Sequence, residues 1–297
     1  MDFAFVLGNH SQAGIDTLYD IMDTIGGQLI DLGHQVRRHD GALLKNHVNI
    51  MIEGFTESFA GFFDGISEHG ARLVIIATEQ PGKPGFNNSK LPHMIGRQRA
   101  FPIVACQADA VWCLVPGVAQ WAKRFNPKAA DLELGHSMTR QRVCWSEVDP
   151  VFDFAFFGSL TPRRKHILDA FAAAGHPVAT GATLTGFLPP ANRDALVASA
   201  KVVLGIDPFP KWRLVSNSRI ATALSIGRPI LCEPPYARTP WTEVGIFARS
   251  HGSFLREAVA MLENWRETRD RQLAIFRSLF SPERCVGAAI TATLDGV

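Results

Sequence analysis

The sequence lacks any apolar run long enough to cross a lipid bilayer. Glycine, proline or a charged residue interrupts every apolar run of the 297 residues, and all are shorter than the ~20 residues that a membrane helix needs. A basic leader is also missing, because Met1 and Asp2 open directly into a strand-like run. We therefore expect neither a membrane span nor a secretion signal.

Cysteine is scarce, and its spacing fits neither a metal site nor a redox motif. The five cysteines are Cys106, Cys113, Cys144, Cys232 and Cys285. Their positions indicate reduced thiols in a cytoplasmic protein. No Asp-x-Asp pair stands in a loop context either. We expect no metal and no resident cofactor.

The chain has little net charge. Its formal charge of +2 comes without a concentrated basic stripe, which argues against general binding of nucleic acid. With 46% hydrophobic and 20% charged residues, each half of the chain can bury a globular core. A chain of this length is expected to form about two domains.

The two halves of the chain open in the same way. In the first half, the apolar run Phe3–Leu7 ends at Gly8, and a helical segment then extends to Gly33. In the second half, the run Phe154–Phe157 ends at a glycine, and a helix follows that closes at Gly175. Glycine after a helix, followed by the next strand, is common in α/β proteins.

Strand-like runs alternate with helix-length segments along the whole chain, which predicts parallel sheets. The further strands are expected at 48–52, 73–77, 110–115, 178, 202–206 and 230–232, and the further helices at 56–68, 94–105, 193–200, 218–226 and 253–280. The predicted fold is α/β with two Rossmann-like domains, residues 1–145 and 146–297, joined by a linker near 140–150.

The turn between the first strand and helix of the second half has the features of an anion site. Gly158 and Ser159 end the strand, and Pro162 suits the first turn of a helix. Free backbone N–H groups at such a helix start attract anions, and Arg163 and Arg164 add positive charge for a diphosphate. An ordinary turn with solvated arginines is the alternative.

A second helix start follows downstream. Ser216, Asn217 and Ser218 all favour the N-cap position. Arg219 falls in the first turn, where the helix dipole disfavours a cation unless an anion is bound. Glu233 follows a predicted strand, where its carboxylate could accept hydrogen bonds from ribose or sugar hydroxyls. Solvated roles for both charged residues are the alternative.

Taken together, these motifs resemble a known family. The run Phe156–Ser159 with Arg163-Arg164 and Ile167-Leu168 resembles the start of the C-terminal domain of bacterial glycosyltransferases with the GT-B fold. The pattern continues through 200–204 and 218–224 to Gly227–Leu231 and Glu233, so the resemblance covers roughly residues 150–235.

The resemblance implies two Rossmann-like domains that face each other across a cleft, with a nucleotide-sugar donor held by the C-terminal domain. It places Gly158, Ser159 and Arg163 near the diphosphate, and Arg219 and Glu233 near the donor phosphates or ribose. The implied activity is metal-independent transfer of a sugar to an acceptor hydroxyl, with the nucleotide-sugar as co-substrate and a glycan, small molecule or protein as acceptor.

One position departs from the family pattern. Many retaining members carry a glutamate one turn into the second helix, where this chain has Thr222. This departure leaves open a non-catalytic GT-B-like scaffold that binds a protein partner. A nucleotide-sugar epimerase of the same fold is the other alternative, and it would need more carboxylates than Glu79 and Glu233.

The candidates for the acceptor side are in the first half. His10 follows the first strand, and a histidine pKa near 6.5 suits a general base. Glu79 ends the strand at 73–77, before a long loop rich in glycine, proline and asparagine. Either side chain could instead be structural or solvated. His136 is expected to be a hinge residue.

Overall fold

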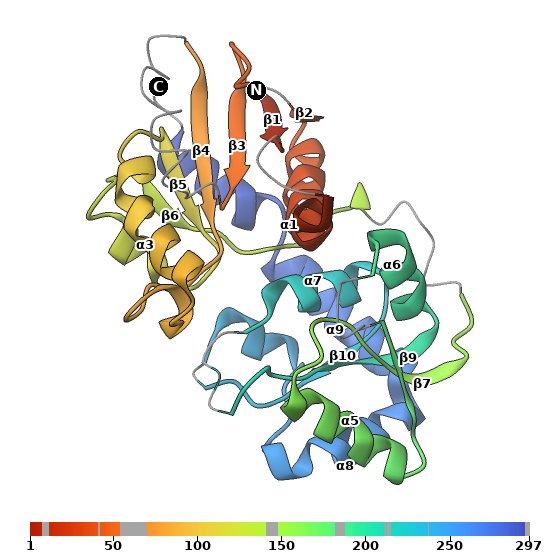
Figure 1. The fold of residues 1–297 in the computed structure, drawn as a ribbon. Helices are drawn as coiled ribbons and strands as arrows, with labels where there is room; N and C mark the ends of the chain where they lie inside the picture. The colour runs from red at the N-terminus through yellow and green to blue at the C-terminus, as the bar shows by residue number, and fades with distance from the viewer. Residues whose placement is uncertain are drawn as a thin grey trace. The chain divides into compact units, whose positions relative to one another are not determined.

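The computed structural model describes residues 1–7, 12–40, 42–53, 70–140, 148–181, 188–210, 212, 215–236 and 238–294. Within them the chain forms two compact units (Figure 1). One unit comprises Met1–Ser11, Gln28–Glu133 and Pro282–Val297, and the other comprises Gln12–Gly27 and Leu134–Ser281. The helix predicted at 56–68 lies outside the described residues, as does most of the predicted linker.

The first unit is built on a parallel sheet with the strand order β2-β1-β3-β4-β5-β6. Its strands are β1 (Asp2–Val6), β2 (Gln35–His39), β3 (Val48–Ile52), β4 (Arg72–Ala77), β5 (Ala110–Cys113) and β6 (Ala129–Asp131). Its helices are α3 (Pro92–Ala105), α4 (Val118–Ala122) and α10 (Ala288–Thr293). Helix α1 (Gln12–Asp31) is divided, since Gln12–Gly27 belong to the second unit and its last residues, from Gln28, to the first. Strands β3 and β4 are almost wholly buried, as expected for central parallel strands.

The second unit is built on a smaller parallel sheet with the order β10-β9-β7-β8. Its strands are β7 (Phe152–Phe156), β8 (Val178–Thr180), β9 (Ala200–Gly205) and β10 (Ile230–Cys232). Its helices are α5 (Pro162–Ala173), α6 (Pro190–Ala198), α7 (Asn217–Ser225), α8 (Phe254–Met261) and α9 (Trp265–Leu279). Figure 1 shows α5 and α8 on one face of this sheet and α6 and α7 on the other.

The core under α5 and α8 is aromatic. Phe154 and Phe156 from β7 are fully buried, and Phe171 of α5 packs edge-on against both Phe154 and Phe254 of α8. Such ring pairs contribute about 0.5–1.5 kcal/mol beyond their area burial. The aromatic run that marked this strand in the sequence therefore anchors the sheet of the second unit.

The two predicted strand–glycine–helix openings are confirmed as elements. Helices α1 and α5 each end one or two residues before a left-handed glycine, Gly33 (φ +83°) and Gly175 (φ +87°). In both parallel sheets the strand order reverses at the first strand, since β1 lies between β2 and β3, and β7 lies between β8 and β9. Ligands of open α/β sheets bind at the carboxyl ends of the strands at such a reversal.

Candidate functional site: the carboxyl ends of β7, β9 and β10

The turn after β7 requires glycine. Gly158 has φ +123°, and a Cβ atom there would lie 2.8 Å from Nη2 of Arg219. Helix α5 then starts with Thr161 as N-cap, whose hydroxyl accepts a hydrogen bond from the N–H of Arg164 at 3.3 Å, and with Pro162 in its first turn. The predicted turn and the predicted start of α7 are thus brought together by direct contact between their residues.

Arg219 is a buried cation without a carboxylate partner among the described residues. Its side chain is 7% exposed, and Nε donates to the carbonyl oxygen of Phe157 at 3.1 Å. The guanidinium also lies over the rings of Phe156 and Phe157, at 5.3 and 5.7 Å from their centroids. Burial lowers the pKa of Arg219. Cation–π contacts offset part of this cost, and a bound anion would offset more.

A second buried guanidinium belongs to Arg164, which the sequence motif did not distinguish from its neighbour. Its Nε donates to the carbonyl oxygen of Ile206 at 2.9 Å, and Nη1 donates to the carbonyl oxygen and hydroxyl of Ser159 at 2.9 and 3.0 Å. Its guanidinium lies 5.3 Å from the ring centroid of Phe156, as does that of Arg219. Burial and the charge of Arg219 lower the pKa of Arg164 to about 9.

Arg163 points to a different group. Its guanidinium forms a bidentate ion pair with Glu233, through Nη1 at 2.7 Å and through Nη2, and Nη1 also donates to the carbonyl oxygen of Asp207 at 2.8 Å. The structure therefore joins two predicted site residues, Arg163 and Glu233, to each other.

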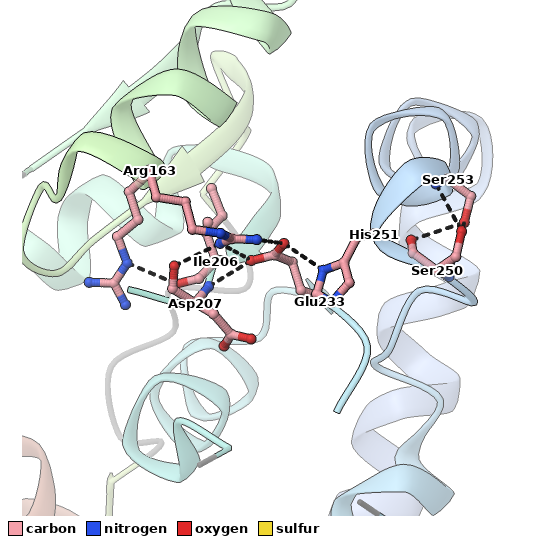
Figure 2. A network of polar contacts seen from close by, with 8 residues as sticks. Arg163, Ile206, Asp207, Glu233, Ser250, His251 and Ser253 are labelled. Carbon is pink, nitrogen blue, oxygen red and sulfur yellow. Dashed lines mark hydrogen bonds and ion pairs between the residues drawn. The ribbon is translucent and has the colours of Figure 1, made fainter. Parts of the chain in front are cut away.

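Glu233 is buried and accepts hydrogen bonds from several directions (Figure 2). Besides Arg163, its donors are the backbone N–H of Asp207 at 2.8 Å and Nδ1 of His251 at 2.9 Å. Burial alone would raise the pKa of Glu233, but these hydrogen bonds outweigh it and lower the pKa. The carboxylate thus ties the ends of β9 and β10 to the start of α5.

An open pocket lies beside this network. Arg219, Ser216 and Glu233 line it, together with Asp207 and the aromatic residues Trp212, Tyr236 and Phe247. The pocket therefore combines a cation, hydrogen-bonding groups and aromatic side chains, which suits a ligand with an anionic and an aromatic part.

Asp207 was not singled out by the sequence. It follows β9 and is half-buried, and no hydrogen bond joins its carboxylate to any residue that the structure describes. Burial and the charge of Glu233 raise the pKa of Asp207 to about 6. Its position at a strand end before Pro208 was the only sequence signal that could have marked it.

The start of α7 differs from a fully capped helix. Ser216 is the N-cap residue, but its side chain makes no capping hydrogen bond, and it lines the pocket instead. Asn217 is buried, and Ser218 is half-buried beside it. The N-terminus of α7, including Arg219 in its first turn, thus lies at the pocket.

Thr222 lies in a buried polar cluster. Nη2 of Arg140 donates to its hydroxyl at 3.0 Å, and Arg140 and Arg193 both bind the carboxylate of Asp20. A glutamate at position 222 would place a second carboxylate beside Asp20. Threonine in place of the family's glutamate at position 222 therefore goes together with an ion-pair cluster in which Asp20 already supplies the carboxylate.

Of the two candidate bases in the first half of the chain, the structure describes only Glu79. His10 lies outside the described residues. Glu79 is half-buried, accepts a hydrogen bond from Nδ2 of Asn87 and lies 3.4 Å from Nη1 of Arg97. Burial raises the pKa of Glu79. Arg97 also binds Glu53, a buried carboxylate at the end of β3 that the sequence analysis missed.

His136 has a structural environment. It is buried, its ring packs edge-on against Phe276, and its backbone N–H donates to the carbonyl oxygen of Phe280 at 2.8 Å.

Among the described residues, no group of three or more His, Cys, Asp or Glu side chains could hold a metal ion. No helix in the described ranges is long and apolar enough to cross a membrane.

Comparison with solved structures shows the fold. The chain superposes over 99% of its length on all of T4 phage β-glucosyltransferase, a DNA-modifying enzyme solved with UDP-glucose, with a TM-score of 0.54 and 10% identity. It covers 99% of AviGT4, a glycosyltransferase of avilamycin A biosynthesis, at a TM-score of 0.58 and 14% identity. The chain has the GT-B fold.

Another structure with this fold, Anabaena HepE in complex with UDP, matches over 100% of both chains with a TM-score of 0.55 and 11% identity. At these identities the likeness establishes the fold alone. No protein-family model matches the sequence, and no curated protein resembles it significantly in sequence.

Proposed function

We propose that the protein is a glycosyltransferase that transfers a sugar from a nucleotide-sugar donor to an acceptor hydroxyl. The observation that carries this proposal is the pair of buried guanidinium groups, Arg164 and Arg219, each 5.3 Å from the ring centroid of Phe156. No described carboxylate binds either group, and Arg219 lines an open pocket beside the N-terminus of α7. Two buried cations without an ion-pair partner among the described residues are costly for a scaffold, whereas a diphosphate would neutralise them.

The fold supports the same ligand class. T4 phage β-glucosyltransferase was solved with UDP-glucose and HepE with UDP. In this chain, Arg219 and the N-terminus of α7 would bind the diphosphate, and Trp212 and Tyr236 would contact the base. The same cation stabilises the negative charge that develops on the diphosphate when the glycosidic bond breaks.

We assign the donor to the second half of the chain, residues 146–297, and the acceptor to residues 1–145. His10 and Glu79 are the proposed bases for the acceptor hydroxyl. The raised pKa of Glu79 brings its carboxyl closer to the range of a general base at neutral pH, while Asn87 and Arg97 hold it in place. The proposed reaction needs no metal ion, because Arg219 supplies the positive charge.

Calorimetry tests the donor assignment. The wild-type protein should bind at least one of UDP, ADP and GDP, with the same affinity in the presence and absence of EDTA. It should also hydrolyse or transfer the sugar of the matching nucleotide-sugar. Absence of binding to all three nucleotides would contradict the proposal. Binding that EDTA abolishes would contradict metal independence alone.

A further inference from the structure

Two carboxylates line the pocket, but only one of them is free to bind a ligand. Glu233, after β10, receives hydrogen bonds from Arg163, from His251 and from the backbone N–H of Asp207. A carboxylate offers about four acceptor sites, and these donors take up those that Glu233 has. A ligand hydroxyl would have to displace one of them.

The second carboxylate, that of Asp207, has no hydrogen-bond donor among the described residues. Figure 2 shows it turned away from Glu233, with no interaction drawn to either oxygen. The backbone of the same residue is fixed on both sides, because its N–H donates to Glu233 at 2.8 Å and its carbonyl oxygen accepts from Arg163 at 2.8 Å. The polar network thus holds the residue in place, and its carboxylate lies at the pocket without a partner among the residues that the structure describes.

The charges in the pocket specify what this carboxylate can bind. Arg219 attracts an anion, and its charge also acts on Asp207. A ligand that satisfies both residues carries an anionic group and, next to it, hydrogen-bond donors. In a nucleoside diphosphate the ribose is bonded directly to the diphosphate, and its vicinal hydroxyls are such donors.

We infer that Asp207, rather than Glu233, accepts the hydrogen bonds of the ribose hydroxyls, and that Glu233 positions Asp207 through the backbone. This inference rests on the proposed function, and it adds a ligand-binding residue that the sequence motif assigned elsewhere. The energetics of the ligand-free protein also support this assignment of Asp207. A half-buried carboxylate without donors costs free energy, as its raised pKa shows, and hydroxyl donors of a ligand would reduce this cost.

The test combines four proteins with two ligands. The proteins are the wild type, Asp207→Asn, Glu233→Gln and Asp169→Asn, a matched control whose carboxylate is 61% exposed on α5. The ligands are the nucleoside diphosphate that binds most tightly among UDP, ADP and GDP, and its 2′,3′-dideoxy analogue. Dissociation constants come from calorimetry, and thermal unfolding of the ligand-free proteins gives the stability readout.

We expect the wild type and Asp169→Asn to prefer the ribose form by about 10- to 100-fold, the usual effect of hydrogen bonds to a charged group. Asp207→Asn should lose most of this preference while its affinity for the dideoxy analogue stays unchanged. This variant should also unfold at a higher temperature than the wild type, whereas replacing a residue with a purely structural role would not raise the unfolding temperature. Glu233→Gln should unfold at a lower temperature and bind both ligands more weakly by the same factor.

The results that overturn the inference are distinct from those that overturn the proposed function. A full preference for ribose in Asp207→Asn, or no preference in the wild type, would overturn the inference alone. Loss of the preference in Glu233→Gln with unchanged affinity for the dideoxy analogue would return the ribose to Glu233. A wild-type protein that binds none of the nucleotides would overturn the proposed function and the inference together.

Discussion

Arg163 and Arg219 belong to the same resemblance motif, but their charges are balanced in different ways. Arg163 is paired with Glu233, whereas Arg219 has aromatic rings and a carbonyl oxygen as its described neighbours. Removing one partner of a buried pair leaves the other charge uncompensated, but removing an unpaired buried charge leaves nothing behind. The two residues should therefore respond oppositely to substitution.

We expect Arg219→Met to weaken nucleoside diphosphate binding by about 10- to 100-fold, since a charge-assisted hydrogen bond is lost. Its thermal stability should equal or exceed that of the wild type. Arg163→Met should instead lower the free energy of unfolding by roughly 3 kcal/mol, because Glu233 stays buried without its main partner. Calorimetry and chemical denaturation measure the two effects. Unchanged nucleotide affinity in Arg219→Met would show that the site is misplaced.

The raised pKa of Asp207 predicts that the stability of the protein depends on pH. Its ordinary value of 3.8 is raised to about 6 by burial and by the charge of Glu233. The folded state favours the protonated carboxyl. Its contribution to the free energy of unfolding is therefore complete below about pH 4 and is lost as pH rises through about 6. Relative to Asp207→Asn, the wild type should lose stability over this range and then level off.

The loss should be about 1–2 kcal/mol, because partial exposure to solvent screens the full penalty. Denaturation of both proteins at several pH values between 4 and 8 measures it. A constant difference across this range would show that Asp207 does not titrate there.

At the scale of elements, the turn between β7 and α5 depends on one glycine. In Gly158→Ala the new Cβ would meet Nη2 of Arg219 at 2.8 Å, on a backbone with φ +123°. We expect a loss of about 1–3 kcal/mol in the free energy of unfolding and weaker nucleotide binding, because Arg219 must move. The matched control is Gly96→Ala within α3, where nothing lies within 4 Å. That substitution should stabilise by about 0.5–1 kcal/mol. Equal effects of the two alanines would contradict the role given to the turn.

Elements with strong local signals were predictable, and some of the short ones were not. The buried strand β4 and the start of α7 agree with the sequence prediction, since continuous apolar residues and residues that favour the N-cap position mark them directly. Strand β6 has three residues, and the helices α4 and α10 have five and six. Segments of this length contain too little of a period to be recognised without a flanking signal such as the Gly227-Arg228-Pro229 turn before the three-residue β10. The packing of β6, α4 and α10 in the sheet and core determines them instead.

The same limit applies to the site. The sequence placed Gly158 and Arg219 on two helix-start motifs, but their contact joins residues 61 positions apart and depends on the tertiary fold. Adjacent residues of α5 also point in different directions, so that Arg163 reaches Glu233 and Arg164 reaches Ser159. Local pattern does not distinguish them. The unpaired state of Asp207 depends on which partners Glu233 takes.

At the scale of the whole molecule, the two compact units each end their parallel strands in polar side chains, but with different chemistry. The second unit presents buried cations after β7 and on α7, which suit a diphosphate. The first presents carboxylates, Glu53 after β3 and Glu79 after β4, held by Arg97. The proposed division between donor binding and proton transfer rests on this difference, and kinetics can test it.

We expect His10→Ala and Glu79→Gln to show which side chain is the base. Loss of a general base lowers kcat by about 10²- to 10⁴-fold, because the acceptor hydroxyl keeps its proton at the transition state. The dissociation constant of the donor nucleotide should stay unchanged in both variants, since the residues that would bind it belong to the other unit. Arg219→Met should show the reverse pattern, with a higher dissociation constant, and Asp169→Asn should change neither. Transfer rates with saturating donor, together with calorimetry, distinguish the cases. If His10→Ala and Glu79→Gln both turn over normally, the base is neither residue; if either one loses nucleotide binding instead, that residue contributes to the donor site and the division of roles between the units is wrong.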